Sequence, residues 1–197
     1  MMNRRHFLGT ATLALATTPA AAATVLFPQS PQASAEPAPR LRQRSAQPVR
    51  VLHLHHLHTE ERLEVSYRTG ERYHRDALKQ LNYFLRDFRT GDVAAMDPQA
   101  FDILFDLKQQ LGEPEALFQI IGGYRSPRTN AMLSKTSNGV AQRSLHLTGQ
   151  AIDIRIDGIP TTEVRDTALA MARGGVGYYP RSNFVHVDTG QVRSWGV

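Results

Sequence analysis

Two short segments in the C-terminal third of the chain hold residue types that could do chemistry together. Residues 144–153 (SLHLTGQAID) carry a histidine and an aspartate on either side of a glycine. Residues 183–188 (NFVHVD) carry a second histidine and a second aspartate, separated by one valine. Side chains alternate between the two faces of a strand. Isoleucines and valines take the core faces of both segments, so Asp153, His186 and Asp188 are expected on the opposite surface. The turn at Gly149 would fold His146 back beside them.

These side chains suit a zinc ion. Two neutral imidazoles and one carboxylate, from His146, His186 and Asp153, leave a fourth coordination position for water, which is the open arrangement of a catalytic site. Zinc lowers the pKa of bound water to about 7 and polarises a carbonyl group. A histidine–aspartate pair alone is more often a surface hydrogen bond, so the residue pattern by itself leaves both interpretations open.

A third segment supplies a cation. Residues 122–127 (GGYRSP) leave a short apolar stretch that reads as a buried strand and enter a helix that begins at Ser126-Pro127. Arg125 would offer its planar guanidinium to a carboxylate, with two parallel hydrogen bonds.

The apolar spacing predicts the elements that position these residues. An initial hairpin of strands 49–58 and 63–67 turns at 59–61, and a capping pair, Asp97-Pro98, opens a helix that ends at Gly112. Further strands are expected at 118–121, 151–156, 176–179, 184–188 and 192–195, and further helices at 72–90, 126–134 and 161–173. The fold class is therefore α+β, with a small, mostly antiparallel sheet flanked by helices.

The N-terminus resembles a twin-arginine export signal. Residues 3–9 (NRRHFLG) precede a weakly apolar run at 10–27, which is too mild for a stable membrane span and is interrupted by Pro19. We expect a signal peptide at 1–35, a flexible linker rich in Pro, Arg, Gln and Ala at 36–48, and one domain at 49–197. The Tat export machinery is then a partner, and the location is periplasmic.

Composition excludes several classes of function. The chain of 197 residues has no cysteine, which rules out disulfide scaffolds, thiolate zinc sites, iron–sulfur clusters and cysteine nucleophiles. A cofactor-loaded redox protein is disfavoured, because there is also no credible flavin or nicotinamide loop. The net charge of +5 includes Arg4 and Arg5, and the first 35 residues hold no acid, so the remaining 21 basic and 18 acidic residues nearly balance. Nucleic acid is therefore not an expected partner.

Taken together, the motifs resemble a known family. The pattern Ser144-x-His146-x-x-Gly149-x-Ala151-x-Asp153, with a later His186, is similar to the zinc signature of the D-Ala-D-Ala peptidase superfamily. That superfamily includes VanX-type dipeptidases and shares its fold with the hedgehog signalling domain. The GYRSP run and the C-terminal FVHVDTGxVRxW resemble YcbK/MepK-type murein endopeptidases more closely, from about residue 48 to the C-terminus.

The resemblance implies roles for individual residues. It implies that His146, Asp153 and His186 bind Zn²⁺ and that Arg125 is a catalytic and substrate-binding residue that orients a peptide carboxylate. Tyr124 and Ser144 are expected to contact substrate beside it. Many superfamily members place a carboxylate base three residues before the last histidine, where this chain has Asn183. Asp188 is our candidate for the general base; the alternative is that it fixes the tautomer of a histidine.

The implied function is an exported zinc metallopeptidase. It would hydrolyse cross-links between peptidoglycan stem peptides during wall remodelling, at bonds between two diaminopimelate residues or between D-Ala and diaminopimelate. A D-Ala-D-Ala carboxypeptidase is the nearest alternative enzyme. A non-catalytic, zinc-stabilised peptidoglycan-binding module is the alternative from another class.

Two other features receive structural interpretations. In the run of histidines at 53–58, His53 and His55 would face opposite to His56 and His58 on a strand, so one ion cannot collect all four. We interpret the run as a polar strand edge near the surface, although it could help to line the substrate cleft. The aromatic side chains of Tyr178, Tyr179 and Trp195 are expected to serve packing more than a substrate groove.

Overall fold

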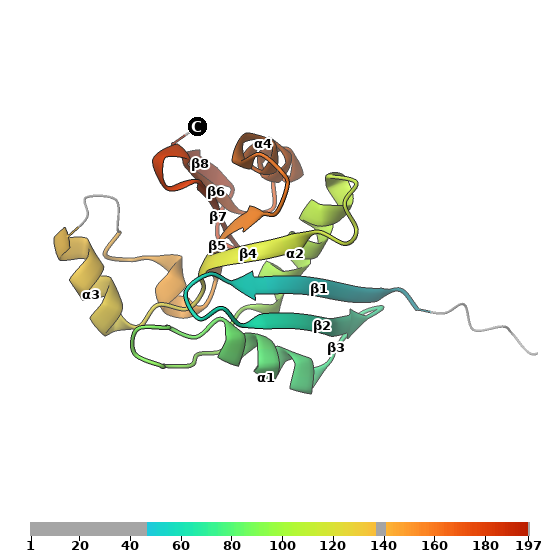
Figure 1. Ribbon diagram of the computed structural model, residues 1–197, viewed down its shortest axis with the longest axis horizontal. Coiled ribbons are helices and arrows are strands. Elements are labelled where there is room, and N and C mark those ends of the chain that lie inside the picture. The colour runs from blue at the N-terminus through green and yellow to red at the C-terminus, as the bar shows by residue number, and fades with distance from the viewer. Residues whose placement is uncertain (1–46, 137–140, 197) are drawn as a thin grey trace, which may run out of the picture. The chain divides into compact units, whose positions relative to one another are not determined.

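The computed structural model describes residues 47–136 and 141–196. The expected signal peptide, and all of the expected linker except its last two residues, lie outside this part of the chain. No helix in the described part is long and apolar enough to cross a membrane. The described chain contains one eight-stranded sheet and four α-helices, which confirms the α+β class (Figure 1).

The sheet has the strand order β3-β2-β1-β4-β5-β7-β6-β8. Its neighbours are antiparallel except for β1 with β4 and β6 with β8, which are parallel. The strands are β1 (Val49–His56), β2 (Arg62–Thr69), β3 (Arg72–Tyr73), β4 (Leu117–Gly122), β5 (Ala151–Ile156), β6 (Gly175–Tyr179), β7 (Phe184–Asp188) and β8 (Arg193–Trp195). The expected mostly antiparallel sheet is thus confirmed, and β5 and β7 lie side by side within it.

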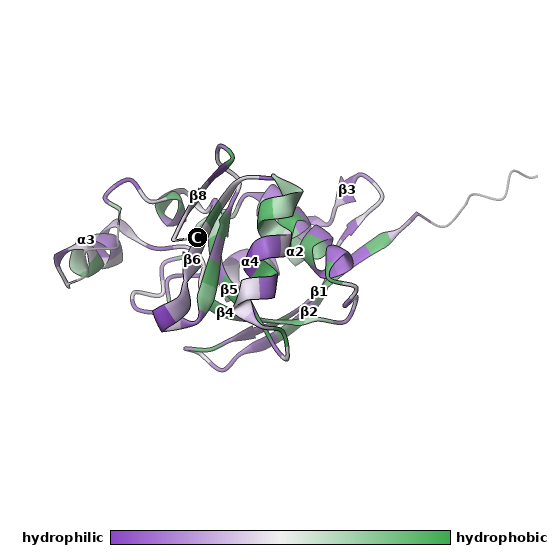
Figure 2. Ribbon diagram, turned by 90° about the horizontal axis from the view of Figure 1, so that it is seen from above, coloured by the Kyte–Doolittle hydropathy of each residue, from purple (hydrophilic) through white to green (hydrophobic). Residues whose placement is uncertain are grey.

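The helices are α1 (Arg75–Phe84), α2 (Pro98–Gln110), α3 (Pro127–Thr136) and α4 (Thr161–Met171). Asp97 caps α2 as predicted, because its carboxylate accepts a hydrogen bond from the N–H of Gln99. Buried side chains of α1, α2 and α4 join one apolar core with the sheet, whereas α3 extends away from it (Figures 1 and 2). The helices therefore cover the core face of the sheet and leave its other face free for a site.

The predicted helix at 72–90 is too long at both ends. Arg72 and Tyr73 pair with β2 as the short strand β3, and the helix ends with Leu85 as its C-cap. Leu85 is fully buried and Phe88 stacks on a neighbouring ring, so both keep the apolar spacing without being helical. Apolar periodicity reports burial, and here burial continues past the last helical turn.

The alternation predicted for β5 and β7 is present. Ile152, Ile154 and Val185 lie in the core, and Asp153 pairs in register with His186 on the opposite face. A bulge between Ile120 and Gly122 brings the end of β4 against Asp153 as well. Three strands of the central sheet therefore meet at one point of the face that the helices leave uncovered.

The histidine run differs from the expected surface edge. β1 lies inside the sheet between β2 and β4, and His56 is completely buried among core aromatic rings. Burial is the main reason that the pKa of His56 falls to about 4, so the ring is neutral. His53 and His55 face the opposite way beside acidic side chains, as the alternation requires, and His58 follows the end of the strand.

Candidate metal centre and substrate cleft

His146 is held by a short 3-10 helix, η1 (Leu145–Thr148). The hydroxyl of Ser144 caps this turn by accepting from the N–H of His146, and Gly149 ends it in the left-handed region at φ 69°. A Cβ at Gly149 would lie 2.4 Å from the carbonyl oxygen of Ala95, so only glycine fits. The Nδ1 atom of His146 lies 2.7 Å from the carbonyl oxygen of Gly123, which orients its Nε2 atom into the site.

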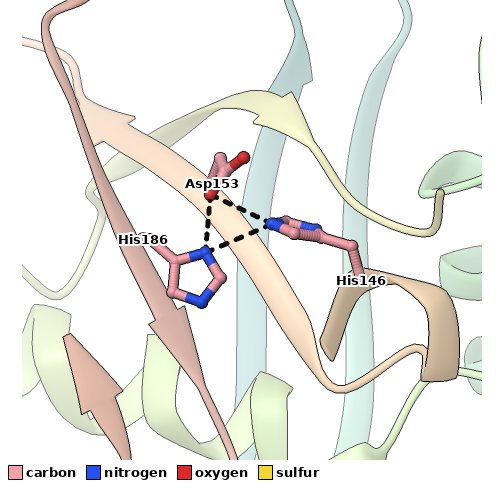
Figure 3. A group of neighbouring side chains, drawn as sticks. All are labelled: His146, Asp153 and His186. Carbon is pink, nitrogen blue, oxygen red and sulfur yellow. Dashed lines mark hydrogen bonds and ion pairs between the residues drawn. The ribbon is translucent and has the colours of Figure 1, made fainter. Parts of the chain in front are cut away.

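Asp153 and His186 complete the group from neighbouring strands (Figure 3). The Oδ1 atom of Asp153 lies 2.9 Å from Nδ1 of His186 and 3.2 Å from Nε2 of His146. The two imidazole nitrogens are 3.2 Å apart, and all three side chains are buried. The structure thus brings together the three residues that the sequence predicts as metal ligands.

These donor atoms fit a tetrahedral metal ion. Ligand atoms about 2.0–2.1 Å from a zinc ion are roughly 3.3 Å from one another. The three observed separations fall just below that value, so small outward movements would admit an ion. Among the described residues, this is the only group of three or more His, Cys, Asp or Glu side chains placed to hold a metal.

Electrostatics also favour a cation at this point. Burial opposes the charged form of His186, but hydrogen bonds to Asp153 and Asp188 outweigh it and raise the pKa of the ring to about 9. Burial likewise opposes ionisation of Asp153, but the two imidazoles hold its pKa well below the usual range. Without a metal, the carboxylate is balanced by a proton on an imidazole, and a metal ion would replace that proton.

Asp188 lies behind His186, on the side away from the three donor atoms. Its carboxylate contacts Nε2 of His186 at 3.0 Å, pairs with Arg193 at 2.7 Å and accepts from the N–H groups of Gly175 and Gly190. The side chain is only 1% exposed. These surroundings match the alternative in which Asp188 fixes the tautomer of a histidine, because an Nε2–H bond leaves the Nδ1 lone pair free for a metal.

Arg125 borders the metal group on another side. Its guanidinium is 3.8 Å from the Oδ2 atom of Asp153 and makes only a long, 3.5 Å contact with Asn130. Desolvation by burial lowers its pKa, although guanidinium groups stay protonated in proteins. Arg125 is therefore a mostly buried cation whose one ion pair among the described residues, with Asp153, is long. Such a cation favours a bound anion.

A cavity of about 680 Å³ opens onto this group. It is lined by His146, Asp153 and His186 together with Arg125 and Ser144, as predicted, and by the aromatic side chains of Tyr179, Phe184 and Trp195. Trp195 donates to the hydroxyl of Tyr179 and packs against the ring of His186. These two aromatic residues thus line a cleft, contrary to the preference for packing, whereas Tyr178 packs against the core as expected.

Two residues of the family motifs, Tyr124 and Asn183, lie outside the large cavity. Tyr124 borders a second, smaller cavity and packs against the core. Asn183 caps a 3-10 turn, η2 (Pro180–Ser182), and its side chain accepts from Thr161. Among the described residues that line the large cavity, Asp153 is the only carboxylate. The position three residues before His186 thus supplies no base.

Sequence reasoning missed two residues next to the cleft, Asp87 and Arg89. Asp87 is buried and accepts from the backbone N–H groups of Ser126 and Arg89. No local motif marks these residues, because their contacts join segments 39 positions apart.

Comparison with known proteins gives a consistent result. A family model described as "Peptidoglycan L,D-endopeptidase MepK" matches residues 44–195. The protein of that name from Escherichia coli strain K12 is 47% identical over 146 residues, which are 74% of this chain and 80% of that protein. The "Probable peptidoglycan L,D-endopeptidase MepK" of Haemophilus influenzae is 44% identical over 146 residues, 74% of this chain and 78% of that protein. No solved structure matches the chain significantly.

Proposed function

Because this chain belongs to the family of the peptidoglycan L,D-endopeptidase MepK, we propose that it is an exported zinc peptidase that cleaves cross-links between peptidoglycan stem peptides. The observation that carries the proposal is the group of His146, Asp153 and His186 at the floor of an open cavity. A zinc-stabilised binding module would need this spacing of donor atoms, but it would not need an open cavity beside them.

These three residues would hold the zinc ion. When bound, zinc supplies a water molecule of lowered pKa and polarises the substrate carbonyl. The chain contributes the geometry: the carbonyl of Gly123 orients His146, and the sheet register fixes Asp153 against His186. Arg125 binds a substrate carboxylate and thereby sets the position of the scissile bond relative to the donor atoms.

Asp188 is assigned here to positioning and not to the general base. Its carboxylate is saturated by His186, Arg193 and two backbone N–H groups, and it does not line the cavity. By accepting from Nε2–H of His186, it keeps the lone pair of Nδ1 directed at the metal position.

The preferred bond is the one between two diaminopimelate residues. An L,D bond joins the carbonyl of an L-configured centre to the amino group of a D-configured centre. In meso-diaminopimelate, a linkage from the L centre of one residue to the D centre of the next has this configuration. The bond between D-Ala and diaminopimelate, and the bond that a D-Ala-D-Ala carboxypeptidase cuts, both join D centres.

The N-terminal residues supply the proposed route to the substrate. Residues 1–35 act as a twin-arginine signal and residues 36–48 as a linker, so the domain at 49–197 works in the periplasm. Replacing Arg4 and Arg5 together by lysine tests this proposal. The double variant is expected to remain unexported in cell fractions, and normal export would contradict the assignment of the Tat route.

A digest of purified muropeptides tests the activity. The chain from Glu36 onward is incubated with cross-linked dimers, with chelator, and with chelator followed by zinc, and the products are read by mass. We expect monomers whose masses place the cut between diaminopimelate residues, and these should disappear with chelator and return with zinc. Loss of a single D-Ala would indicate a carboxypeptidase. No product from folded, zinc-loaded protein would favour the binding module.

A variant separates catalytic from structural zinc. His146→Ala removes one donor from a turn outside the apolar core, so the protein should stay folded and lose turnover. Unfolding of this variant, measured by circular dichroism, would indicate a structural zinc site instead.

A further inference from the structure

The smaller cavity beside Tyr124 shares lining residues with the large cavity and adds a second arginine, Arg89. We propose that Arg89 and Arg125 form a second carboxylate-binding subsite next to the metal centre, which holds the free side-chain carboxylate of a diaminopimelate residue. The identity of this ligand rests on the proposed function, whereas the subsite itself rests on the contacts below.

The cavity adjoins the metal group. It has a volume of about 180 Å³ and shares Arg125, Asp153 and Phe184 with the larger cavity, so the two are neighbouring compartments. Arg89 lines only the smaller one. A substrate whose scissile bond lies in the larger compartment could therefore place a neighbouring group in the smaller one.

The rim of the smaller compartment is built by stacked side chains. The ring of His58 stacks on Phe88 with the centroids 4.0 Å apart, and the guanidinium of Arg89 lies over the same ring at 4.1 Å. This packing restricts Arg89 although the residue is exposed to solvent. The side chain makes no ion pair or hydrogen bond with any residue in the described part of the chain.

A single buried carboxylate holds both arginine-bearing segments. The Oδ1 atom of Asp87 accepts from the N–H of Arg89 at 3.0 Å, and its Oδ2 atom accepts from the N–H of Ser126, next to Arg125, at 2.9 Å. Asp87 is thereby used by backbone groups and does not neutralise either guanidinium by direct contact. Asp87 therefore holds the two arginine-bearing segments at a fixed separation, and both of its carboxylate oxygens are already hydrogen-bonded.

The carboxylates of the compartment are engaged by other groups, which leaves guanidinium N–H donors of Arg89 for a bound anion. The two carboxylates that line it are Asp87, bound to backbone N–H groups, and Asp153, bound to the two imidazoles. A carboxylate bound between the two guanidinium groups would match their fork geometry.

The test compares two peptides that differ only in the side-chain carboxylate of diaminopimelate. Zinc-loaded wild-type protein, Arg89→Gln and Arg72→Gln are titrated by calorimetry with a stem tripeptide that ends in diaminopimelate. The second peptide carries an amide in place of the side-chain carboxylate. Arg72 is an exposed arginine on the edge strand β3, which β2 and β1 separate from β4, and serves as the control for the loss of one positive charge.

We expect wild type and Arg72→Gln to bind the carboxylate peptide about tenfold more tightly than the amide. Arg89→Gln should lose most of this preference, through weaker binding of the carboxylate peptide. A wild type without preference, or an Arg89→Gln protein that keeps it, would overturn the subsite. Hydrolysis of the cross-linked dimer is measured separately, so a failure of the peptidase proposal would leave this binding result interpretable.

Discussion

At the scale of single residues, the contact of Asp188 with Nε2 of His186 fixes which nitrogen of that ring can bind a metal. If it positions His186, replacing it by asparagine puts an amide N–H₂ among donors that now point at a carboxylate. We expect Asp188→Asn to weaken zinc binding about 10- to 100-fold, with part of the activity restored at saturating zinc. Competition with a calibrated chelator measures the affinity.

If Asp188 were the general base, the same variant would give a different result. Its zinc affinity would stay at the wild-type value, and its turnover would remain lost at any zinc concentration. Asp166→Asn, on the exposed side of α4, provides the matched control and should change neither quantity.

Some residues of the site could be placed from the sequence, and others could not. Asp153 and His186 could be placed on one surface, because strand alternation is a local rule and their neighbours are isoleucine and valine. The role of Asp188 stayed open, because it depends on which side of a ring the carboxylate lies. Asp87 was missed, since its partner Ser126 comes from a distant segment, and Arg89 was missed because only the fold brings it to the same cavity as Arg125.

At the scale of elements, η1 has to end at Gly149 for His146 to reach the site. Gly149→Ala would combine a left-handed alanine, about 1–2 kcal/mol, with a clash against the carbonyl of Ala95. We expect a loss in the free energy of unfolding of roughly 3 kcal/mol and weaker zinc binding. Denaturant titration and chelator competition measure the two effects.

Gly158→Ala is the control for this prediction. Gly158 also has a positive φ, 74°, but its missing Cβ would meet nothing within 4 Å. This variant should lose only about 1–2 kcal/mol and bind zinc normally. Equal effects of the two substitutions on zinc affinity would contradict the view that the end of η1 aims His146.

Asp87 ties the loop after α1 to the start of α3, and this link depends on pH. Burial opposes its ionisation, but hydrogen bonds led by those from Thr129 and Ser126 lower its pKa from the usual 3.8 to about 2. A lowered folded-state pKa stabilises the fold above the unfolded value and loses this contribution as pH falls through the folded one. The stability advantage of wild type over Asp87→Asn should therefore shrink by about 2 kcal/mol between pH 5 and pH 2.

Denaturant titrations of both proteins across this range measure the difference. Asp76→Asn, which changes an exposed carboxylate on α1, is the control for the loss of one carboxylate. A constant difference for Asp87→Asn would mean that its carboxylate does not hold the two segments in the charged form.

Elements also explain why their ends were predicted less well than their order. The hairpin, the Asp97 cap and the strands of the site follow from local signals in a few adjacent residues. The two-residue strand β3 has no such signal and exists only because β2 offers free pairing groups beside it. Leu85 was assigned to a helix because burial in the core, and not helical structure, governs its spacing.

At the scale of the whole molecule, the apolar core is independent of the metal centre. Its buried residues come from α1, α2, α4 and the core face of the sheet, whereas the three donor residues lie on the other face. Backbone pairing already places two of these residues opposite each other, and a carbonyl orients the third. The sheet register and this carbonyl contact therefore position the three donor residues independently of the core packing.

This separation predicts the effect of removing the metal. Chelated protein should keep its far-UV circular dichroism and unfold cooperatively, because the core loses no contact. It should do so at a lower Tm, since an ion that binds only the folded state stabilises it by about 4 kcal/mol at 1,000 times its Kd. For a domain of this size that energy corresponds to about 10 °C. Thermal scans with chelator and after return of zinc measure the shift, and a chelated protein without a cooperative transition would show that the fold needs the metal.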